Sequence, residues 1–254
     1  MRNHDLTEEI RDYWSKRSES FDLAFGHRIQ PGAEAAAWAE PMRRHLPAAP
    51  AKVLELACGT GEVTQLLLDL GYQLTALDFS AAMLARARRK HAGRPGLRFL
   101  EADAQATMEP AGQYDAVVCR HLVWTLTRPE QAFADWMRIL RPGGILLVYD
   151  GDWSGPRPSG RLAARLLSWW DRLAPDPDYD GALSGRHAAI MQKLPFGAGL
   201  TFEKLAPLLH SAGFTDIRCH DHEPIARAQR RVTGLRNRLR TRVYQRFILT
   251  ARKP

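Results

Sequence analysis

The chain has 254 residues, of which 45% are hydrophobic, and its formal net charge is +8. This length is enough for one large α/β domain with a substantial core and a small insertion. An apolar run of 18 residues is missing, which excludes a membrane-spanning helix, and the charged N-terminal stretch lacks the apolar segment of a signal peptide. We expect a cytoplasmic protein that is a monomer or a homodimer.

Three cysteines, Cys58, Cys119 and Cys219, lie far apart in the sequence. Their odd number and wide spacing argue against a disulfide framework and against a cysteine-based zinc site. Each lies in or beside an apolar run that resembles a strand. We therefore expect three buried, inert thiols.

Arginines account for much of the positive charge and gather near the end of the sequence. A basic cluster can attract nucleic acid or acidic ligands. This one lacks interleaved aromatic residues and any RNA-binding signature, so we favour a solvated or dimer-facing surface, with an anionic ligand or nucleic acid as the alternative. The cluster comprises Arg227, Arg230, Arg231, Arg236, Arg238, Arg240, Arg242 and Arg246.

The first 150 residues alternate between helical and strand patterns. In chain order we predict helices at 5–17 and 33–46, a strand at 52–56, a helix at 62–70, a strand at 73–77, a helix capped by Ser80, strands at 97–101 and 114–119, a helix at 130–140 broken by Arg141-Pro142-Gly143-Gly144, and a strand at 145–149. This alternation predicts a parallel sheet with right-handed crossovers.

The alternation lapses after residue 150. We predict a Gly/Pro-rich stretch at 151–160, an apolar helix that carries Leu166, Leu167, Trp169 and Trp170, a loop at 175–181, a helix at 201–212, and two final strands at 214–219 and 244–251 joined by the basic segment. We interpret 151–200 as an inserted cap on a single domain and 201–254 as a C-terminal helix and hairpin.

The loop Glu55-Leu56-Ala57-Cys58-Gly59-Thr60-Gly61 follows the first predicted strand. Ligands of open α/β sheets bind at the carboxyl ends of strands, so this loop is the expected ligand site. Gly59 and Gly61 allow close backbone approach, and the next helix offers free N–H groups. A Gly-x-Gly by itself is a weak signal, because any tight strand-to-helix loop needs glycine.

Asp78 strengthens this interpretation. It ends the second strand, 17 residues after Gly61, where a carboxylate can accept hydrogen bonds from both hydroxyls of a ribose; a simple turn residue is the alternative. Thr64 occupies the place of the third glycine of the dinucleotide motif, which argues against NAD.

Several segments in the same order resemble class I S-adenosylmethionine (SAM)-dependent methyltransferases. VLELACGTGEVT is similar to the family's first motif, LTALDFSAAMLARAR to the second and RFLEADAQ to the third, while YDAVVCRHLVWTL and RILRPGG are similar to the fourth strand and the segment after it. The resemblance covers residues 10–150 and extends weakly beyond, and it is greatest to the ubiquinone/menaquinone-biosynthesis branch and to small-molecule methyltransferases of secondary metabolism. One departure is Ala57-Cys58, where the family usually has Gly-Cys or Gly-Ala-Gly.

The resemblance implies a fold and a division of the chain. The fold is α/β and Rossmann-like: a seven-stranded, mostly parallel sheet with an antiparallel last strand, a helical N-terminal lid and an inserted cap. We place the lid at 1–46, the SAM-binding core at 47–150, the cap at 151–200 and the C-terminal helix and hairpin at 201–254.

The resemblance also implies SAM as cofactor, with S-adenosylhomocysteine as product, and it implies roles by position. Glu55 would orient the loop or the methionine amine, and Arg120 would lie near the methionine part of SAM. Asp103 would meet the adenine amino group, with the backbone of Ala104 beside it. The remaining cofactor-binding candidates are Tyr13, Trp14, Ala57, Gly59, Gly61, Asp78, Phe79 and Met83. For Tyr13 and Trp14, packing of a terminal helix is the alternative.

His121 is the catalytic candidate, because it directly follows the fourth strand and a general base helps when the acceptor must lose a proton. A structural hydrogen bond is the alternative for this histidine. We expect His27, His187 and Tyr179 to be surface or packing residues. Neighbouring residues on an extended segment alternate faces, so 220–223 (His-Asp-His-Glu) is not expected to hold a metal ion.

The predicted acceptor is a small molecule. Trp124, Trp153, Trp169, Trp170 and Phe196 lie in or beside the cap, which suits a flat aromatic or heterocyclic compound, although core packing explains them equally well. The Asn/Asp-Pro-Pro-Tyr motif that grips a flipped base is absent, so nucleic acid is a less favoured partner. We predict methyl transfer to nitrogen or oxygen, with a heteroaromatic nitrogen favoured. The alternatives are an RNA methyltransferase that uses the arginine cluster and a SAM-binding protein without turnover.

Overall fold

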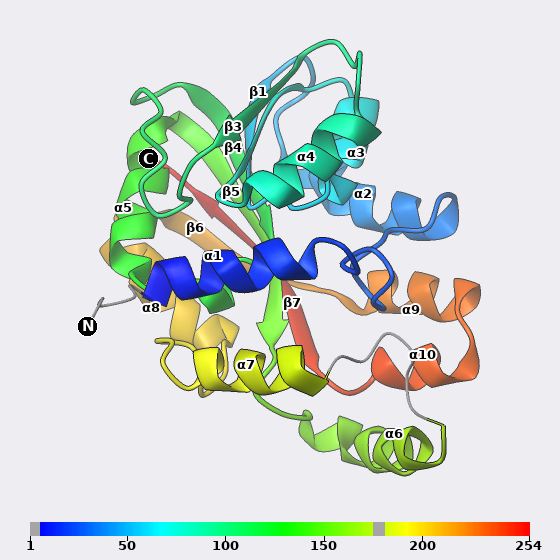
Figure 1. Cartoon of the computed structure of the whole chain (residues 1–254). Helices are drawn as coiled ribbons and strands as arrows, with labels where there is room; N and C mark the ends of the chain where they lie inside the picture. The colour runs from blue at the N-terminus through cyan, green and yellow to red at the C-terminus, as the bar shows by residue number, and fades with distance from the viewer. Residues whose placement is uncertain (1–5, 175–180) are drawn as a thin grey trace.

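The computed structural model describes residues 6–174 and 181–254, and in this part of the chain a seven-stranded sheet forms the centre (Figure 1). The strand order is β3-β2-β1-β4-β5-β7-β6. Strands β1 to β5 are parallel, whereas β7 is antiparallel to both β5 and β6, which confirms the predicted fold class. The strands are β1 (Lys52–Leu56), β2 (Gln73–Asp78), β3 (Leu97–Glu101), β4 (Tyr114–Arg120), β5 (Leu140–Asp152), β6 (Thr215–Asp221) and β7 (Gln245–Arg252).

Helices cover both faces of the sheet and close its carboxyl end. They are α1 (Leu6–Arg17), α2 (Ala33–His45), α3 (Glu62–Asp69), α4 (Ala81–Lys90), α5 (Pro129–Ile139), α6 (Arg161–Leu173), α7 (Gly181–Met191), α8 (Phe202–Ser211), α9 (Glu223–Val232) and α10 (Leu235–Arg240), with short 3₁₀ turns η1 (Val123–Thr125) and η2 (Pro158–Gly160). No helix in the described ranges combines the length and hydropathy that a membrane crossing requires.

The sheet separates two apolar cores, because successive side chains of a strand point to opposite faces. On one face Leu54 of β1 packs with a cluster that includes Trp136 of α5. On the other face Val53 packs with Trp38 of α2 and Leu67 of α3. A parallel sheet covered on both faces needs continuous apolar strands, which is the pattern that made β1, β2 and β4 easy to predict.

Helix α1 lies across the carboxyl ends of the strands, as Figure 1 shows, with α7 beside it. Polar contacts join the two helices: Lys193, just after α7, donates to Glu9 Oε2 at 2.7 Å, and Arg186 donates to the Glu9 carbonyl at 3.2 Å. The N-terminal segment is thus fixed over the sheet by a helix from the region predicted as a cap.

The structure differs from the predicted elements in three places. Strand β5 starts at Leu140, so Arg141–Gly144 continues the strand through a register shift instead of breaking it. The connection between β6 and β7 contains α9 and α10, so the predicted C-terminal hairpin is wrong, although the antiparallel pairing is right. The apolar helix of the cap is α6, whereas α7 was not predicted; residues 175–180 of the predicted loop, including Tyr179, lie outside the described residues.

The prediction for the cysteines is correct for two of the three. Cys58 and Cys119 are buried, as the apolar runs around them indicate. Cys219 is exposed, because β6 is an edge strand at the end of the sheet and most of its residues face solvent.

We predict that Trp136→Ala destabilises the fold by roughly 3–5 kcal/mol, because it removes a fully buried side chain and leaves a large cavity. It also removes the indole N–H that donates to the Ala104 carbonyl at 2.7 Å. The matched control is Trp169→Ala, at a tryptophan that is 63% exposed, for which we expect a change within about 0.5 kcal/mol. Urea unfolding of both variants measures the difference; equal destabilisation would contradict the assignment of the core.

Candidate active site

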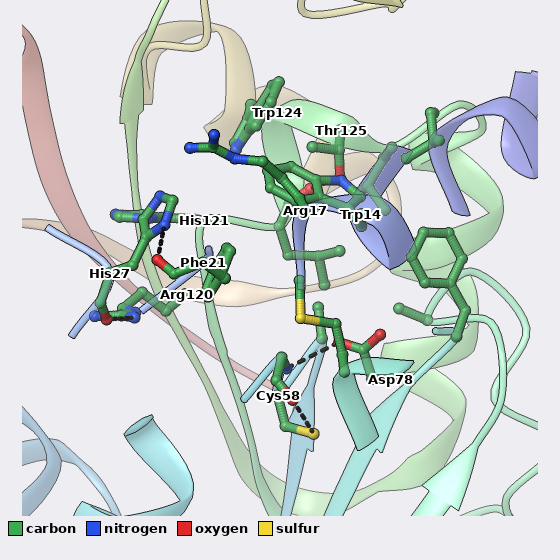
Figure 2. A pocket seen from close by; sticks show the side chains of 18 of the residues that line it. Trp14, Arg17, Phe21, His27, Cys58, Asp78, Arg120, His121, Trp124 and Thr125 are labelled. Carbon is green, nitrogen blue, oxygen red and sulfur yellow. Dashed lines mark hydrogen bonds between the residues drawn. The ribbon is translucent and has the colours of Figure 1, made fainter. Parts of the chain in front are cut away.

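A cavity of about 410 Å³ opens at the carboxyl ends of β1, β2 and β4, beneath α1 (Figure 2). The predicted site residues that line it are Tyr13, Trp14, Glu55, Ala57, Gly59, Asp78, Phe79, Met83, Asp103, Ala104, Arg120 and His121. Gly61 is not among the lining residues. The structure therefore gathers into one cavity side chains that are more than 100 residues apart in sequence.

The loop after β1 takes a tight turn that brings backbone to the cavity wall. Ala57 and Gly59 have positive φ angles of 51° and 56°, a left-handed conformation that glycine adopts freely and alanine adopts at a cost of about 1 kcal/mol. The turn is anchored to β2 by a hydrogen bond from Cys58 N to the Leu77 carbonyl at 2.8 Å. A Cβ on Gly59 would meet only the Phe21 ring, at 3.8 Å, so this face of the loop is open.

Asp78 connects this loop to the next helix. One carboxylate oxygen accepts from Gly59 N at 2.8 Å and the other from Ser80 N at 2.9 Å. Ser80 in turn caps α4 by accepting from Met83 N, as the sequence predicts. Burial raises the pKa of Asp78 to about 6, while the backbone N–H donors oppose that rise. A carboxylate has about four lone-pair sites, so acceptor capacity remains for a ligand hydroxyl.

Glu55, the penultimate residue of β1, is buried and lines the cavity. Its Oε2 accepts from the Thr64 hydroxyl at 2.5 Å, which links the strand to the first turn of α3. Burial raises its pKa to about 8, so the carboxyl is largely protonated at neutral pH. Thr64, which replaces the third glycine of the dinucleotide motif, therefore has a structural task of its own.

Gly61 has a conformational function at the start of α3. Its φ is 89°, and its carbonyl lies 2.9 Å from Nε2 of His91. A Cβ at this position would approach His91 Nε2 to 2.6 Å. Glycine is required here by the backbone angle and by the neighbouring ring, and the residue supports the loop without facing the cavity.

Next to the loop, Arg120 forms one side of the cavity. Its Nη2 donates to the His27 carbonyl at 2.6 Å, and its guanidinium lies over the Trp38 ring at 5.2 Å. Its Nη1 is buried and has no hydrogen-bond partner in the described residues. His27 stacks on Phe21, and burial lowers the pKa of His27 to about 4, so it is neutral. His27 also lines the cavity, and its stacking on Phe21 agrees with the predicted packing role.

At the opposite end of the loop site, Asp103 and Ala104 lie after β3, and Phe79 and Met83 lie after β2. Asp103 Oδ1 accepts from Gln105 N at 2.8 Å, which shapes the turn. Arg11 of α1 lies 5.6 Å from the centre of the Phe79 ring. These contacts fix the apolar and acidic groups at the place where the resemblance puts the adenosine.

His121 directly follows β4, at a positive φ of 57°, and its backbone N–H donates to the Tyr149 carbonyl at 2.8 Å. Its ring meets the Trp153 ring edge to face at 4.8 Å. Burial holds the pKa of His121 well below its usual value, and the nearby Arg120 and Arg246 lower it further. The imidazole is therefore neutral at pH 7 and can accept a hydrogen bond.

Beyond His121 the cavity is aromatic (Figure 2). Trp14 and Trp124 pack edge to face at 6.2 Å, and His187 of α7 lies 5.4 Å from Trp124. Trp153 also lines this half, and so does His187, whose contacts with Tyr13 and Trp124 agree with the predicted packing role. The other proposed cap aromatics are placed elsewhere: Trp169 is exposed, Phe196 is buried in the core, and Trp170 borders a separate surface depression.

Arginine positions near the end of the sequence also differ from the prediction of one solvated surface. Arg246 of β7 lines the cavity, with its guanidinium 5.4 Å from the centre of the Trp153 ring. Arg230 pairs with Glu223 and Arg236 pairs with Asp171, which reduces the charge presented to solvent. Arg246 and Tyr244 also line the cavity, which the sequence did not lead us to predict. Their spacing of two residues at the start of β7 places them on one face, but the position of β7 in the sheet was needed to know which face.

The described residues contain no cluster of histidine, cysteine, aspartate or glutamate that could hold a metal ion. In the segment 220–223, His220 is within hydrogen-bond distance of the Thr250 hydroxyl on β7, whereas His222 is buried against Trp38. Both rings also contact α2, His220 at His45 and His222 at Trp38.

Comparison with known proteins agrees with this geometry. Residues 54–148 match the family model described as "Methyltransferase domain". The chain is 35% identical over 173 residues to a demethylmenaquinone methyltransferase of Thermus thermophilus, covering 66% of this chain and 76% of that protein. The chain belongs to the class I SAM-dependent methyltransferases.

Other matches are more partial or more distant. A trans-aconitate 2-methyltransferase of an Acidovorax species is 38% identical over 140 residues, which is 53% of this chain and 52% of that protein. A structure of Haemonchus contortus phosphoethanolamine N-methyltransferase 2 with phosphomonomethylethanolamine and S-adenosylhomocysteine shares the fold, with a TM-score of 0.67, 15% identity, and coverage of 98% of this chain and 60% of that one.

The cofactor of this family, SAM, fits the residues present. The open face of Gly59 admits a ligand against the backbone, and Asp78 retains acceptor capacity beside it. The unpartnered Nη1 of Arg120 suits a carboxylate. These three features lie on one wall of the cavity, from the end of β2 to the end of β4.

We predict that Gly61→Ala destabilises the fold by roughly 2–4 kcal/mol, because the methyl group must displace the His91 ring and break its contact with the Gly61 carbonyl. Gly93→Ala is the matched control: its φ is also positive, at 76°, but nothing lies within 4 Å of the new Cβ, so we expect about 1 kcal/mol. Thermal unfolding compares the two variants, and equal losses would refute the role given to His91.

Proposed function

We propose that the chain transfers the methyl group of SAM to a nitrogen or oxygen of a small aromatic or heterocyclic metabolite. The supporting observation is the aromatic half of the cavity, which is continuous with the cofactor wall and roofed by α1 and α7. A concave, mostly apolar site with a few polar groups is typical of small-molecule binding.

We propose a role in cofactor binding for each of the following residues on this wall of the cavity. Asp78 would accept the ribose hydroxyls, and the backbone of Ala57 and Gly59 would approach the methionine part. Glu55 would hold the loop through Thr64 and face the amine, while Arg120 would pair with the carboxylate. Phe79, Met83, Asp103 and Ala104 would surround the adenine, and Tyr13 and Trp14 of α1 would close the site from above.

When bound, SAM supplies a methyl group on a sulfonium that is already activated. The protein therefore needs chiefly to orient the acceptor and to exclude water, which can supply much of the acceleration. Trp14, Trp124 and Trp153 form flat walls for this purpose. Neutral His121 at the junction of the two halves would accept a hydrogen bond from an N–H or O–H group of the acceptor and so orient it.

A nitrogen acceptor is favoured over an alcohol. The low pKa of His121 makes it a weak base, and Glu55 is largely protonated and held by Thr64. A heteroaromatic nitrogen with an available lone pair needs no strong base, whereas an alcohol does. The proposal of a small acceptor also agrees with the inward position of Arg246, which leaves fewer arginines for an RNA surface.

The direct test is incubation of the full chain with methyl-labelled SAM and a low-molecular-weight metabolite extract. We expect label to appear in small molecules, and His121→Asn to slow the transfer by roughly tenfold to a hundredfold because an oriented acceptor contact is lost. Trp169→Ala, at an exposed tryptophan, is the control that should retain the wild-type rate.

Label found in RNA alone would support the nucleic-acid alternative. Absence of label in every fraction, with SAM bound, would support a binding protein without turnover.

Asp78 provides a prediction for pH. Its carboxylate must be charged to accept the ribose hydroxyls, and its pKa in the free protein is about 6. The Kd for S-adenosylhomocysteine should therefore be steady near pH 7 and rise as the pH falls below 6, towards tenfold per pH unit. Calorimetry between pH 5 and 7 measures this slope, with circular dichroism to verify folding.

In Asp78→Asn the affinity should be weak and the slope absent, whereas Asp69→Asn, at an exposed aspartate of α3, should behave as wild type. A Kd that stays constant across pH 5 to 7 in the folded wild-type protein would show that Asp78 does not bind the ribose.

A further inference from the structure

Three arginines line the cavity: Arg17, Arg120 and Arg246. Within residues 6–174 and 181–254, none of them forms an ion pair with a carboxylate. Of the acidic groups that line the same cavity, Asp78 binds two backbone N–H groups, Asp103 accepts from Gln105 N, and Glu55 is largely protonated. The cavity therefore has more positive than negative charge on its walls.

Arg246 comes from β7, which does not pair with β1, the strand before the cofactor loop. Its guanidinium lies over the Trp153 ring. In the described part of the chain its one hydrogen bond runs from Nη1 to Gln229 Oε1, at 3.2 Å. Its Nε is enclosed and unpartnered. The Gln229 amide donates to Glu34 at 3.0 Å, so a neutral side chain stands between the guanidinium and that carboxylate.

This arrangement is costly unless an anion completes it. Burial, followed by repulsion from Arg120, lowers the pKa of Arg246 to about 10, which still leaves the side chain charged at pH 7. A buried charge without a hydrogen-bonded counterion destabilises a protein. A neutral residue could pack against Trp153 equally well, so packing alone does not account for an arginine at this position.

The cofactor supplies one carboxylate, which can pair with one cation. Arg120 is placed for it, since this residue ends β4 next to the cofactor loop and has a free Nη1. Arg246 lies over Trp153, whose ring also meets His121, and Trp153 and Tyr244 line the cavity with their rings 5.5 Å apart. The positive charge at this end is thus left for the acceptor.

We propose that Arg246 forms an anion subsite that binds a carboxylate or phosphate group on the acceptor while Trp153 and Tyr244 contact its flat part. The inference rests on the proposed function and narrows its substrate class to anionic aromatic or heterocyclic compounds. A guanidinium offers paired N–H donors that match either oxyanion, and such charge-assisted bonds are roughly twice as strong as neutral ones.

An anion in this subsite also affects His121. The pKa of His121 is held down by burial and then by Arg120, Arg246, His27 and His222. An anion beside Arg246 offsets the repulsion from that guanidinium. His121 therefore accepts a proton more readily when the acceptor is in place than when the subsite is empty.

The test uses the full chain saturated with S-adenosylhomocysteine, so that the cofactor's own carboxylate site is filled. Benzoate, phenyl phosphate and the neutral analogue benzamide are titrated separately, and tryptophan fluorescence reports binding beside Trp153. We expect at least one anion to bind about tenfold or more tightly than benzamide. The preferred anion identifies the carboxylate or the phosphate as the group recognised.

Two variants locate the effect. Arg246→Gln should remove the preference for the anion while the Kd for S-adenosylhomocysteine changes less than about twofold, far below the tenfold effect of a lost charged contact. Arg242→Gln, at an exposed arginine four residues earlier, should keep the preference.

Three results would overturn the inference: equal binding of anion and benzamide, no measurable binding of either anion, or a preference that persists in Arg246→Gln. Loss of S-adenosylhomocysteine binding in Arg246→Gln would also overturn it, by assigning Arg246 to the cofactor. If wild-type protein fails to bind S-adenosylhomocysteine, the proposed function itself fails, which is a different outcome.

Discussion

The carboxylate of Asp78 is the contact on which the site depends. It accepts from Gly59 N in the loop after β1 and from Ser80 N at the start of α4, and so it joins two strand ends and two helices. Because the carboxylate is buried, both N–H groups are also needed to keep it charged. This one group thus holds the Gly59 loop and the start of α4 in place. It is also the proposed acceptor for the ribose.

A second constraint is the uneven distribution of charge along the cavity. Burial keeps the His121 imidazole neutral, and the charges of Arg120 and Arg246, which line the same cavity, lower its pKa further. The acidic groups are gathered at the ends of β1, β2 and β3, where SAM would bind. The proposed cofactor end of the cavity therefore differs in charge from the proposed acceptor end. This difference allows the charge of the acceptor to be tested, which the aromatic walls alone would not.

Local patterns in the sequence were sufficient for the parallel half of the fold and for most of the residues that line the cavity at the ends of β1, β2 and β4. The apolar runs of β1, β2 and β4, the cap at Ser80 and the motif around Gly59 are each decided within about ten residues. The acceptor end could not be predicted in this way, since Arg246 and His187 reach the cavity through the order of β7 in the sheet and the packing of α7 on α1. Trp169 shows the converse, because an aromatic residue in an apolar run proved to face solvent.

The most direct test of the account is a crystal structure of the chain with S-adenosylhomocysteine. We expect the ribose hydroxyls to contact the Asp78 carboxylate and the methionine part to lie against Gly59 and Arg120. We expect the sulfur to face the aromatic half of the cavity, beside His121 and Trp153. A ligand whose ribose does not contact Asp78, or whose sulfur points away from that half, would contradict it.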